Sequence, residues 1–271
     1  MNIDLYLKEL ESKSIYIIRE AYWEYRDNLA LLWSMGKDST TLVHLTRKAF
    51  LGRIPIPIIH IDTTFKFKQI YEFRNKYAKE WNLRLIIAKN DSALRERMSP
   101  EKGRFNCCNA LKTEALKRVI ERYNLKALLV AIRRDEHTIR AKERYFSVRD
   151  REFKWNYQNQ PLELWMEYYK TQSETGTHFR VHPLLHWREI DVWRYIKKER
   201  LPIVNLYFAK RGKRYRSIGC EYCCEPINSS ANSIDKIIKE IQNTTISERS
   251  GRSQDKENIY AMQRLRSLGY M

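Results

Sequence analysis

No stretch of the chain approaches the ~20 consecutive apolar residues that span a bilayer. The opening residues, MNIDLYLKELESKS, carry charged side chains where a secretory signal would need an apolar run. Internal repeats and low-complexity segments are also lacking. Hydrophobic residues nevertheless make up 43% of the 271 residues, enough for a folded core. We therefore expect a globular cytoplasmic protein without a membrane partner.

Acidic residues are few relative to basic ones: 33 Asp and Glu stand against 51 Lys and Arg, a net charge of +18. Such a charge favours a polyanionic partner, nucleic acid above all, whose binding weakens with salt. The alternative is a basic enzyme that spends its cations on nucleotide phosphates. Phosphate and base contacts are predicted in the segment around AKRGKRYR, from Lys210, Arg211, Lys213, Arg214 and Arg216 together with Tyr207, Phe208 and Tyr215.

Short apolar runs alternate with amphipathic helical patterns. The predicted strands are 29–34, 54–62, 83–89, 125–132 and 178–185, and the predicted helices between or after them are 35–50, 67–81, 109–124 and 188–200. This order indicates an α/β fold with a doubly wound, mainly parallel sheet. Residues 90–108 and 140–177 break the rhythm, and we expect functional or covering loops there.

A phosphate-type loop is predicted between the first strand and the helix after it. Ser34-Met35-Gly36-Lys37-Asp38-Ser39-Thr40 combines hydroxyl groups, a lysine and a glycine at a helix N-terminus, where backbone N–H groups favour an anion. Asp38 and Ser39 are expected to cap that helix. The spacing differs from that of a Walker loop, and a plain strand–helix connection is the alternative.

Further motifs in the same order identify a family resemblance. They are SMGKDST, KSIYIIRE, HLTRKAF, HIDTTFKFKQIYEFR, LKTEALK, RRDEHTIRAKERYFSVRDR, ELW, RVHPLLHWREIDVWRYI and TTISERSGR. The chain resembles the phosphoadenylylsulfate-reductase family of PP-loop ATP pyrophosphatases, and most closely its branch of sulfate adenylyltransferase small subunits. The resemblance runs from the N-terminal helix to the last helix.

The resemblance implies an adenine nucleotide α-hydrolase-like fold that binds ATP and Mg²⁺, adenylylates an oxyanion and releases pyrophosphate. By the motifs, the β,γ-phosphates and Mg²⁺ would be held by Ser34, Gly36, Lys37, Asp38, Ser39 and Thr40. The nucleoside would lie against His60, Asp62 and Thr63. The α-phosphate and the attacking oxyanion would meet Arg133, Arg134, Glu136 and Arg140, with Arg249 and Arg252 closing over the phosphates.

Two domains are expected on this basis. Residues 1–204 would form the nucleotide-binding α/β domain with an N-terminal helix. Residues 205–271 would form a small basic, cysteine-containing extension that packs over the site, with helices at 233–243 and 257–268.

The chain departs from that branch at two places. Val130 and Ala131 stand where glycines are expected before the arginine motif, which predicts a reshaped acceptor pocket. NLYFAKRGKRYRSIGC joins two blocks that a long segment separates in the sulfate-activating subunits. If that segment serves their GTPase partner, this chain need not share the partner.

The five cysteines fall into two clusters. Cys107 and Cys108 lie before a helix, and Cys220 and Cys223 form a C-x-x-C turn. In iron–sulfur relatives of this family, cysteines at these places hold a [4Fe–4S] cluster, and the resemblance implies the same for these four. A Cys₄ zinc site and buried inert thiols are the alternatives. Cys224 is spare, either a sulfur-accepting thiol or a packing residue.

The sequence supports several functions. The first hypothesis is an ATP pyrophosphatase that activates DNA phosphate for sulfur insertion, as in DNA phosphorothioation, with a cysteine desulfurase and other modification proteins as partners. The alternative is a sulfate adenylyltransferase small subunit with a GTPase partner, and a further one is a tRNA thiolation enzyme. A nucleic-acid-binding module with an inactive nucleotide fold is disfavoured by the intact motifs. No cysteine follows Cys224, so a thiol-dependent reductase lacks its nucleophile.

Overall fold

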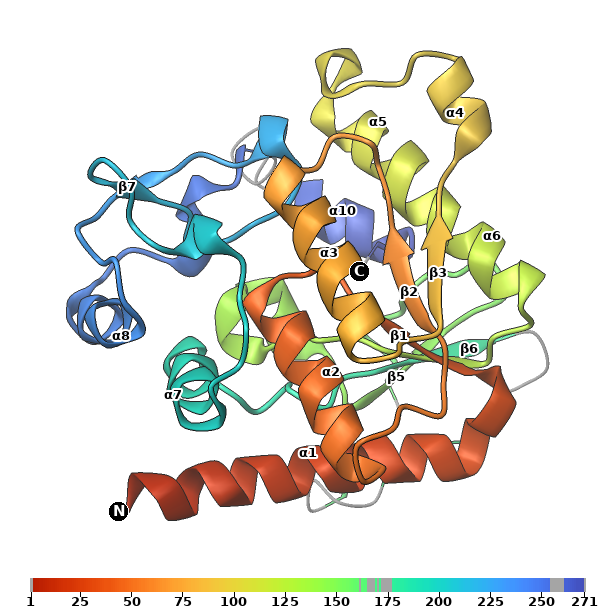
Figure 1. Ribbon diagram of the computed structural model, residues 1–271. Helices are drawn as coiled ribbons and strands as arrows, with labels where there is room; N and C mark the ends of the chain where they lie inside the picture. The colour runs from red at the N-terminus through yellow and green to blue at the C-terminus, as the bar shows by residue number, and fades with distance from the viewer. Residues whose placement is uncertain are drawn as a thin grey trace.

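A single six-stranded sheet organises the molecule, and its strand order is β3-β2-β1-β4-β6-β5 (Figure 1). The computed structural model describes residues 2–160, 162–164, 169, 171, 177–253 and 261–270. The strands are β1 (Leu29–Leu32), β2 (Ile58–Ile61), β3 (Leu85–Ala88), β4 (Ala127–Leu129), β5 (Phe146–Arg149) and β6 (His178–Val181). Neighbouring strands run parallel except β5, which pairs antiparallel with β6 at the edge. The predicted doubly wound, mainly parallel sheet is confirmed.

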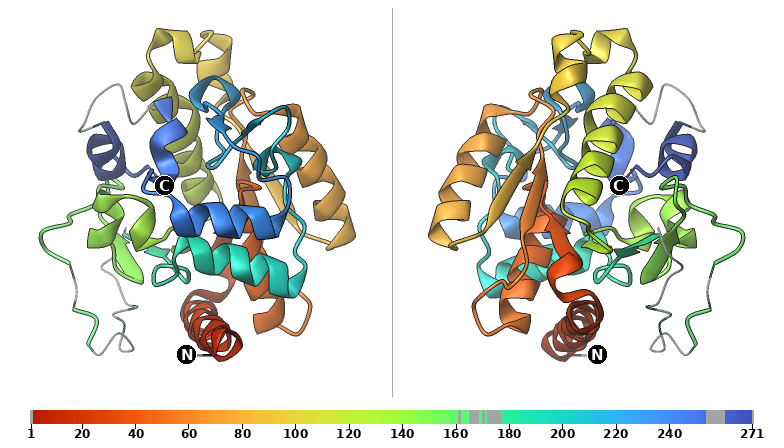
Figure 2. Two further views of the ribbon diagram at one scale, coloured as in Figure 1. Left: turned by 90° about the vertical axis from the view of Figure 1, so that its left-hand side faces the viewer. Right: turned by 90° about the vertical axis from the view of Figure 1, so that its right-hand side faces the viewer.

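Helices cover both faces of this sheet: α2 and α3 lie on one face, and α6 lies on the other (Figure 2). The long helix α1 packs against α2. The longer helices are α1 (Ile3–Tyr25), α2 (Lys37–Ala49), α3 (Lys68–Glu80), α6 (Glu114–Arg122), α7 (Glu189–Glu199), α8 (Ile234–Asn243) and α10 (Ala261–Ser267). Shorter turns are η1 (Arg26–Asn28), α4 (Asp91–Arg95), η2 (Pro100–Lys102), α5 (Arg104–Cys108), η4 (Arg134–Glu136), η5 (Thr138–Lys142), η6 (Asn205–Tyr207), η7 (Glu221–Cys223) and η8 (Glu248–Gly251).

Three local predictions need correction. Residues 90–108 are not a loop but fold into α4, η2 and α5. The expected irregular stretch 140–177 contains the strand β5, and parts of it (161, 165–168, 170, 172–176) lie outside the described residues. The predicted helix 109–124 begins as a π-helical turn, η3 (Asn109–Thr113), before α6. Of the predicted helix 257–268, residues 257–260 lie outside the described part and α10 accounts for most of the rest.

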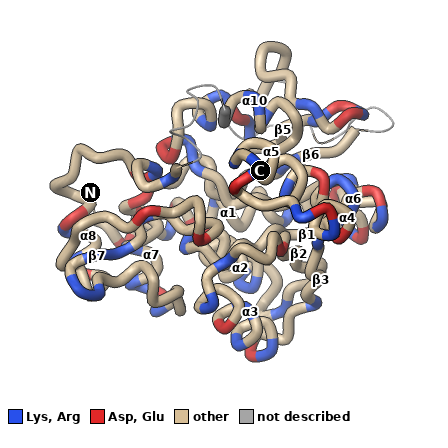
Figure 3. Tube along the Cα trace, turned by 90° about the horizontal axis from the view of Figure 1, so that it is seen from above, with Lys and Arg blue, Asp and Glu red and all other residues tan. Residues whose placement is uncertain are grey.

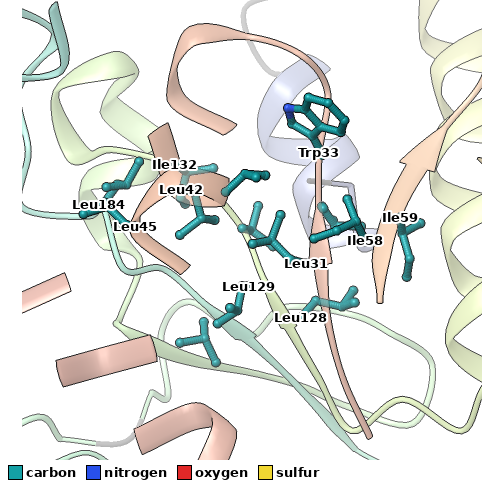
Figure 4. Close-up of a cluster of buried hydrophobic side chains, with 14 of the residues drawn as sticks. Leu31, Trp33, Leu42, Leu45, Ile58, Ile59, Leu128, Leu129, Ile132 and Leu184 are labelled. Atoms are coloured by element: carbon teal, nitrogen blue, oxygen red, sulfur yellow. The ribbon is translucent and has the colours of Figure 1, made fainter. Parts of the chain in front are cut away.

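The core lies between the sheet and its helices, where Leu31, Ile58 and Leu128 are fully buried beside Leu42 of α2 (Figure 4). All four residues of β1 and all four of β2 are buried. This is typical of central parallel strands that are covered on both faces. It explains why these strands appear in the sequence as continuous apolar runs rather than as alternating ones.

The C-terminal part packs onto this core. α8 lies beside α7 (Figure 2), and Val204, Tyr207 and Ile237 belong to the same buried cluster as the sheet. A small hairpin of β7 (Lys213–Arg214) and β8 (Ile227–Asn228) projects from this region. Within the described ranges, no helix combines the length and apolarity needed for a membrane span.

The sheet has a switch point between β1 and β4. From β1 the chain crosses to β2 on one side of the sheet. β4 lies on the other side of β1, and β6 is the next strand beyond it. In doubly wound sheets, ligands bind in the crevice beyond the carboxyl ends of the strands at such a point. The loops that follow β1 and β4 therefore define where a site is expected.

Candidate nucleotide site

The loop after β1 forms a compact turn onto the N-terminus of α2. Gly36 is the N-cap of α2 with φ −70°, and the helix starts at Lys37. The Ser39 hydroxyl donates to the Gly36 carbonyl at 3.1 Å and receives the Ser34 N–H at 3.2 Å. Asp38 lies in the first turn and makes no capping bond, so the expected side-chain caps are not formed.

Tyr207 completes this turn from a distant part of the chain. Its hydroxyl accepts the Lys37 N–H at 2.9 Å, which ties η6 to the first turn of α2. The ring is buried, and it packs edge-on against Trp193 of α7 with ring centroids 5.4 Å apart. Tyr207 was predicted as a stacking residue for nucleic acid, and burial against the loop makes it unavailable for that role.

A ring of charges lies directly beneath the loop. The Lys37 ammonium pairs with Asp38 at 3.0 Å and with Glu248. The Arg133 guanidinium pairs with the same two carboxylates and, through Nε, with Asp135 at 3.0 Å. Although burial alone would raise it, the pKa of Glu248 lies well below its usual range because Arg133 and Lys37 stabilise the carboxylate.

A cavity opens above the loop at the switch point. Its apolar wall comes from the ends of the central strands, and its polar rim comes from the loop, from the segment after β4 and from the C-terminal part. The predicted site residues that line it are Ser34, Gly36, Lys37, Asp38, Ser39, Glu136, Arg140, Arg249 and Arg252. The loop and these arginines therefore face one shared space.

Glu136 organises the arginine side of the cavity. It pairs with Arg140 and, at 3.1 Å, with Arg249 of η8. Arg140 is buried, and burial together with the neighbouring Arg249 and Arg266 holds its pKa well below its ordinary value. The excess of positive charge here is suited to an anionic ligand.

Six of the residues predicted for the nucleotide site do not line the cavity. The His60 Nδ1–H donates to the Trp33 carbonyl at 3.1 Å, Asp62 accepts from the Tyr71 hydroxyl at 2.9 Å, and Thr63 contacts the Cys220 thiol at 3.2 Å. Burial lowers the pKa of His60 to about 3, so this imidazole is neutral. The other three are Thr40, which accepts from Trp33, Arg133 beneath the loop, and Arg134, which lies over the Tyr145 ring.

On β2 the residues that face the cavity are Ile59 and Ile61. His60 and Asp62 were expected there because both belong to a family motif at the end of the second strand. The strand is buried on both faces and its residues do not alternate between apolar and polar, so its pattern does not indicate which residues face the cavity.

Among the cavity residues that were not predicted for the nucleotide site are Lys66, Lys112, Tyr207 and Tyr270. The Lys112 ammonium lies 3.4 Å from the Tyr270 hydroxyl and 3.6 Å from the Cys108 sulfur. Both lysines occur inside family motifs, but nothing local distinguishes them from surface lysines. Val130 and Ala131, which stand where the family resemblance leads us to expect glycines, also line the cavity.

The two cysteine clusters lie near each other behind this wall. All five cysteines are buried, and burial followed by the neighbouring Cys108 raises the pKa of Cys107 to about 12. Burial would also raise the pKa of Cys220, but Lys112, Lys66 and the Thr63 hydroxyl lower it to about 7. Over the described part of the chain, no three His, Cys, Asp or Glu side chains are placed to hold one metal ion.

Cys224 has separate contacts. Its sulfur accepts the Gly219 N–H at 3.0 Å and the Arg252 guanidinium at 2.9 Å. Since Arg252 and Gly219 also line the cavity, Cys224 lies directly behind its wall.

The basic segment differs from its prediction. Arg214 is buried against Glu240, and Arg216 pairs with Glu189 at 2.7 Å, so neither is available to contact nucleic acid. Lys210, Arg211 and Lys213 are exposed on the β7 hairpin. Figure 3 shows basic residues around β7 and α7, on α3 and beside α4 and α6, so the positive charge is spread over several elements.

The sheet, its switch point and the loop after β1 define an α/β domain of the adenine nucleotide α-hydrolase-like fold. Solved structures agree. The phosphoadenylyl-sulfate reductase of Candida auris superimposes with a TM-score of 0.56 at 18% identity over 82% of this chain and 96% of that one. The Candida glabrata FMN adenylyltransferase superimposes with a TM-score of 0.61 at 16% identity over 92% and 91%.

The chain belongs to the phosphoadenosine phosphosulfate reductase domain family, whose model matches residues 28–226. Sulfate adenylyltransferase subunit 2 of Saccharophagus degradans and that of Psychromonas ingrahamii are each 38% identical to it, over 98% of this chain and 97% of theirs. The family predicted from the motifs is thereby confirmed. The alignments extend over 296 residues, so these relatives contain residues that this chain of 271 lacks.

Proposed function

We propose that the protein binds ATP in the cavity and transfers its adenylyl group to an oxyanion, releasing pyrophosphate. The observation that carries this proposal is that the loop and the arginine group line one cavity at the switch point. Lys37, Ser34 and Ser39 would bind the terminal phosphates, and Asp38, whose carboxylate also pairs with Lys37 and Arg133, would hold a Mg²⁺ ion. Arg140 and Arg249 would stabilise the charge that develops on the α-phosphate.

The rest of the cavity suits the nucleoside. Ile59, Ile61, Val130 and Ile132 supply an apolar wall between the loop and the arginines. An adenine ring needs such a surface together with a few polar groups. Because the phosphate side and the apolar side meet at the ends of β1 and β4, the scissile α–β bond would lie between them.

Sulfate is the acceptor that the relatives favour. The relatives at 38% identity are named as sulfate adenylyltransferase subunits and are matched over nearly their whole length. This supports the alternative drawn from the sequence better than its first hypothesis. On this proposal the chain would work with a GTPase subunit.

DNA phosphate is the second candidate acceptor, and the cysteines are the observation that favours it. Burial would lower the pKa of Lys112, but Cys108 and Cys220 hold it well above its usual value. One cysteine of each cluster therefore lies close to this buried lysine. Cys107, Cys108, Cys220 and Cys223 would hold a [4Fe–4S] cluster, whose negative charge Lys112 would offset, or alternatively a zinc ion. Lys210, Arg211 and Lys213 are exposed for contact with a nucleic acid, and a cysteine desulfurase would supply sulfur.

The acceptor is tested by measuring pyrophosphate release from ATP. We expect release that depends on sulfate, or alternatively on DNA together with a cysteine desulfurase. Asp38→Ala combined with Ser39→Ala should abolish it, whereas His44→Gln, on α2 beside Glu199, should not. Full activity in the double variant would place the site elsewhere.

The metal centre is tested by anaerobic purification followed by iron, sulfide and zinc analysis. A brown protein with iron and sulfide is expected, and Cys107→Ser should lose both while Cys224→Ser keeps them. Stoichiometric zinc without iron would replace the cluster by the zinc alternative. A protein with neither would leave the cysteines as buried thiols.

A further inference from the structure

Glu248 stands at the centre of the charge ring and was not among the predicted site residues. It opens the short turn η8, 211 residues after Lys37. One of its carboxylate oxygens contacts Lys37 and the other contacts Arg133. Asp38 contacts the same two cations, so two carboxylates and two cations form a closed ring.

This ring is deeply buried. The side chains of Lys37 and Arg133 are 1% and 0% exposed, and that of Glu248 is 5% exposed. Buried charges need compensation by opposite charges, because each ion loses its hydration. Glu248 therefore supplies a negative charge that these cations require when no ligand is bound.

Lys37 also lines the cavity, whereas Glu248 does not. A phosphate that reaches Lys37 through the cavity would bring a third anion to the two cations. Asp38 is fixed next to Lys37 in the first turn of α2, but Glu248 is carried by a four-residue turn. Of the two carboxylates, Glu248 is therefore the one that can be displaced.

Glu248 also borders a space other than the first cavity, into which its side chain can move. Glu248 lines a second cavity, whose other charged residues are three arginines and two carboxylates: Arg188, Arg194, Arg216, Asp135 and Glu189. The arginines outnumber the other carboxylates there, so a third carboxylate would balance the charge of this cavity. Glu248 stays where it is because of the two cations, and a phosphate that binds Lys37 from the cavity reduces that advantage.

We infer that Glu248 is an internal competitor of the nucleotide's terminal phosphates, which occupies Lys37 and Arg133 until a pyrophosphate group displaces it toward the second cavity. This inference rests on the proposed function, since it takes the loop after β1 as the place of those phosphates. η8 also carries Arg249, which reaches the arginine side of the cavity. Displacement of Glu248 therefore couples phosphate binding to the position of Arg249.

The test is the affinity of Glu248→Gln for inorganic pyrophosphate and for ATP, measured by titration calorimetry. The variant should bind pyrophosphate about tenfold more tightly than the wild type, because an interaction with a charged group no longer competes. Its melting temperature without ligand should fall, and pyrophosphate should raise it by more than it raises that of the wild type. Glu240→Gln, which disturbs the buried pair with Arg214, should lower the melting temperature without changing pyrophosphate affinity.

Unchanged or weaker pyrophosphate binding by folded Glu248→Gln would overturn the inference and make Glu248 a residue that merely holds Lys37. If Glu248→Gln does not fold, Glu248→Asp keeps the charge with a shorter reach, and the same gain in affinity, smaller in size, is expected. Failure of the wild type to bind either ligand would refute the inference together with the proposed function. Binding by the wild type without a gain in the variant would refute the inference alone.

Discussion

Replacement of Arg133 by methionine tests the charge ring most directly. Arg133 is fully buried and pairs with Asp38, Asp135 and Glu248. Breaking a buried ion pair by removing one partner costs about 3–5 kcal/mol, because the remaining charge is left uncompensated. For a chain of this size each kcal/mol corresponds to about 2–4 °C, so the melting temperature should fall by roughly 6–20 °C.

The loss should depend on pH, and its sign follows from Glu248. The folded protein holds the pKa of Glu248 below its unfolded value, so its contribution to stability is present above the unfolded pKa and is lost as the pH falls through the lowered folded pKa. Without Arg133 much of this contribution disappears. The difference in unfolding free energy between wild type and Arg133→Met should therefore be largest near neutral pH and should shrink below about pH 4.5.

The assay is chemical unfolding at several pH values, with Arg53→Met as the control because Arg53 is exposed. The control should differ little from the wild type at every pH. A loss below about 1 kcal/mol at neutral pH would mean that the ring contributes no more than surface pairs do. A large loss that is independent of pH would show that packing, not charge, is what Arg133 provides.

Three further predictions concern single residues. Gly36→Ala should leave the melting temperature nearly unchanged but weaken ATP binding: a Cβ there would meet Ser34 and Tyr207 at ordinary distances of 3.4 and 3.5 Å, and would face the phosphates. Calorimetry and pyrophosphate release check it, and normal ATP binding would remove the loop from the phosphate site. Glu143→Gln should destabilise the fold by about 3–5 kcal/mol in denaturant titrations, since this buried carboxylate pairs with Arg149 and Arg266; a neutral result would show that the arginines are neutralised otherwise. Gly251→Ala should cost about 1–3 kcal/mol because its Cβ would lie 2.5 Å from the Glu225 carbonyl oxygen, and an unaffected melting temperature would show that η8 shifts freely.

Much of the fold and the loop after β1 could be predicted because their signals are local. β1, β2 and β4 are buried and mostly apolar. The hydroxyl residues and the glycine around Lys37 all fall within the short segment 34–40. The edge strand β5 was missed because Phe146–Arg149 is short and lies in a polar stretch. A four-residue alternation carries too little signal to be separated from a loop.

The far wall of the cavity could not be predicted for a different reason. Tyr207 and Tyr270 reach the cavity, and Glu248 reaches the charge ring beneath it, from positions more than 150 residues away from the groups they contact. Nothing around these residues in the sequence marks them as partners of Lys37 or Lys112. The π-helical turn after Cys108 is likewise invisible in an otherwise ordinary helical pattern.

The same long-range closure has a consequence for how the protein is made. Before residues 205–250 have been made, a nascent chain can already pair β1, β2 and β4. It still lacks the Tyr207 hydroxyl and Arg249 that line the cavity, and Glu248 of the charge ring. Contacts between distant segments form late, because a long loop must close first. On the proposed function, ATP binding should consequently begin only once the segment that carries Arg249 has been made and folded, and shorter nascent chains should not bind ATP.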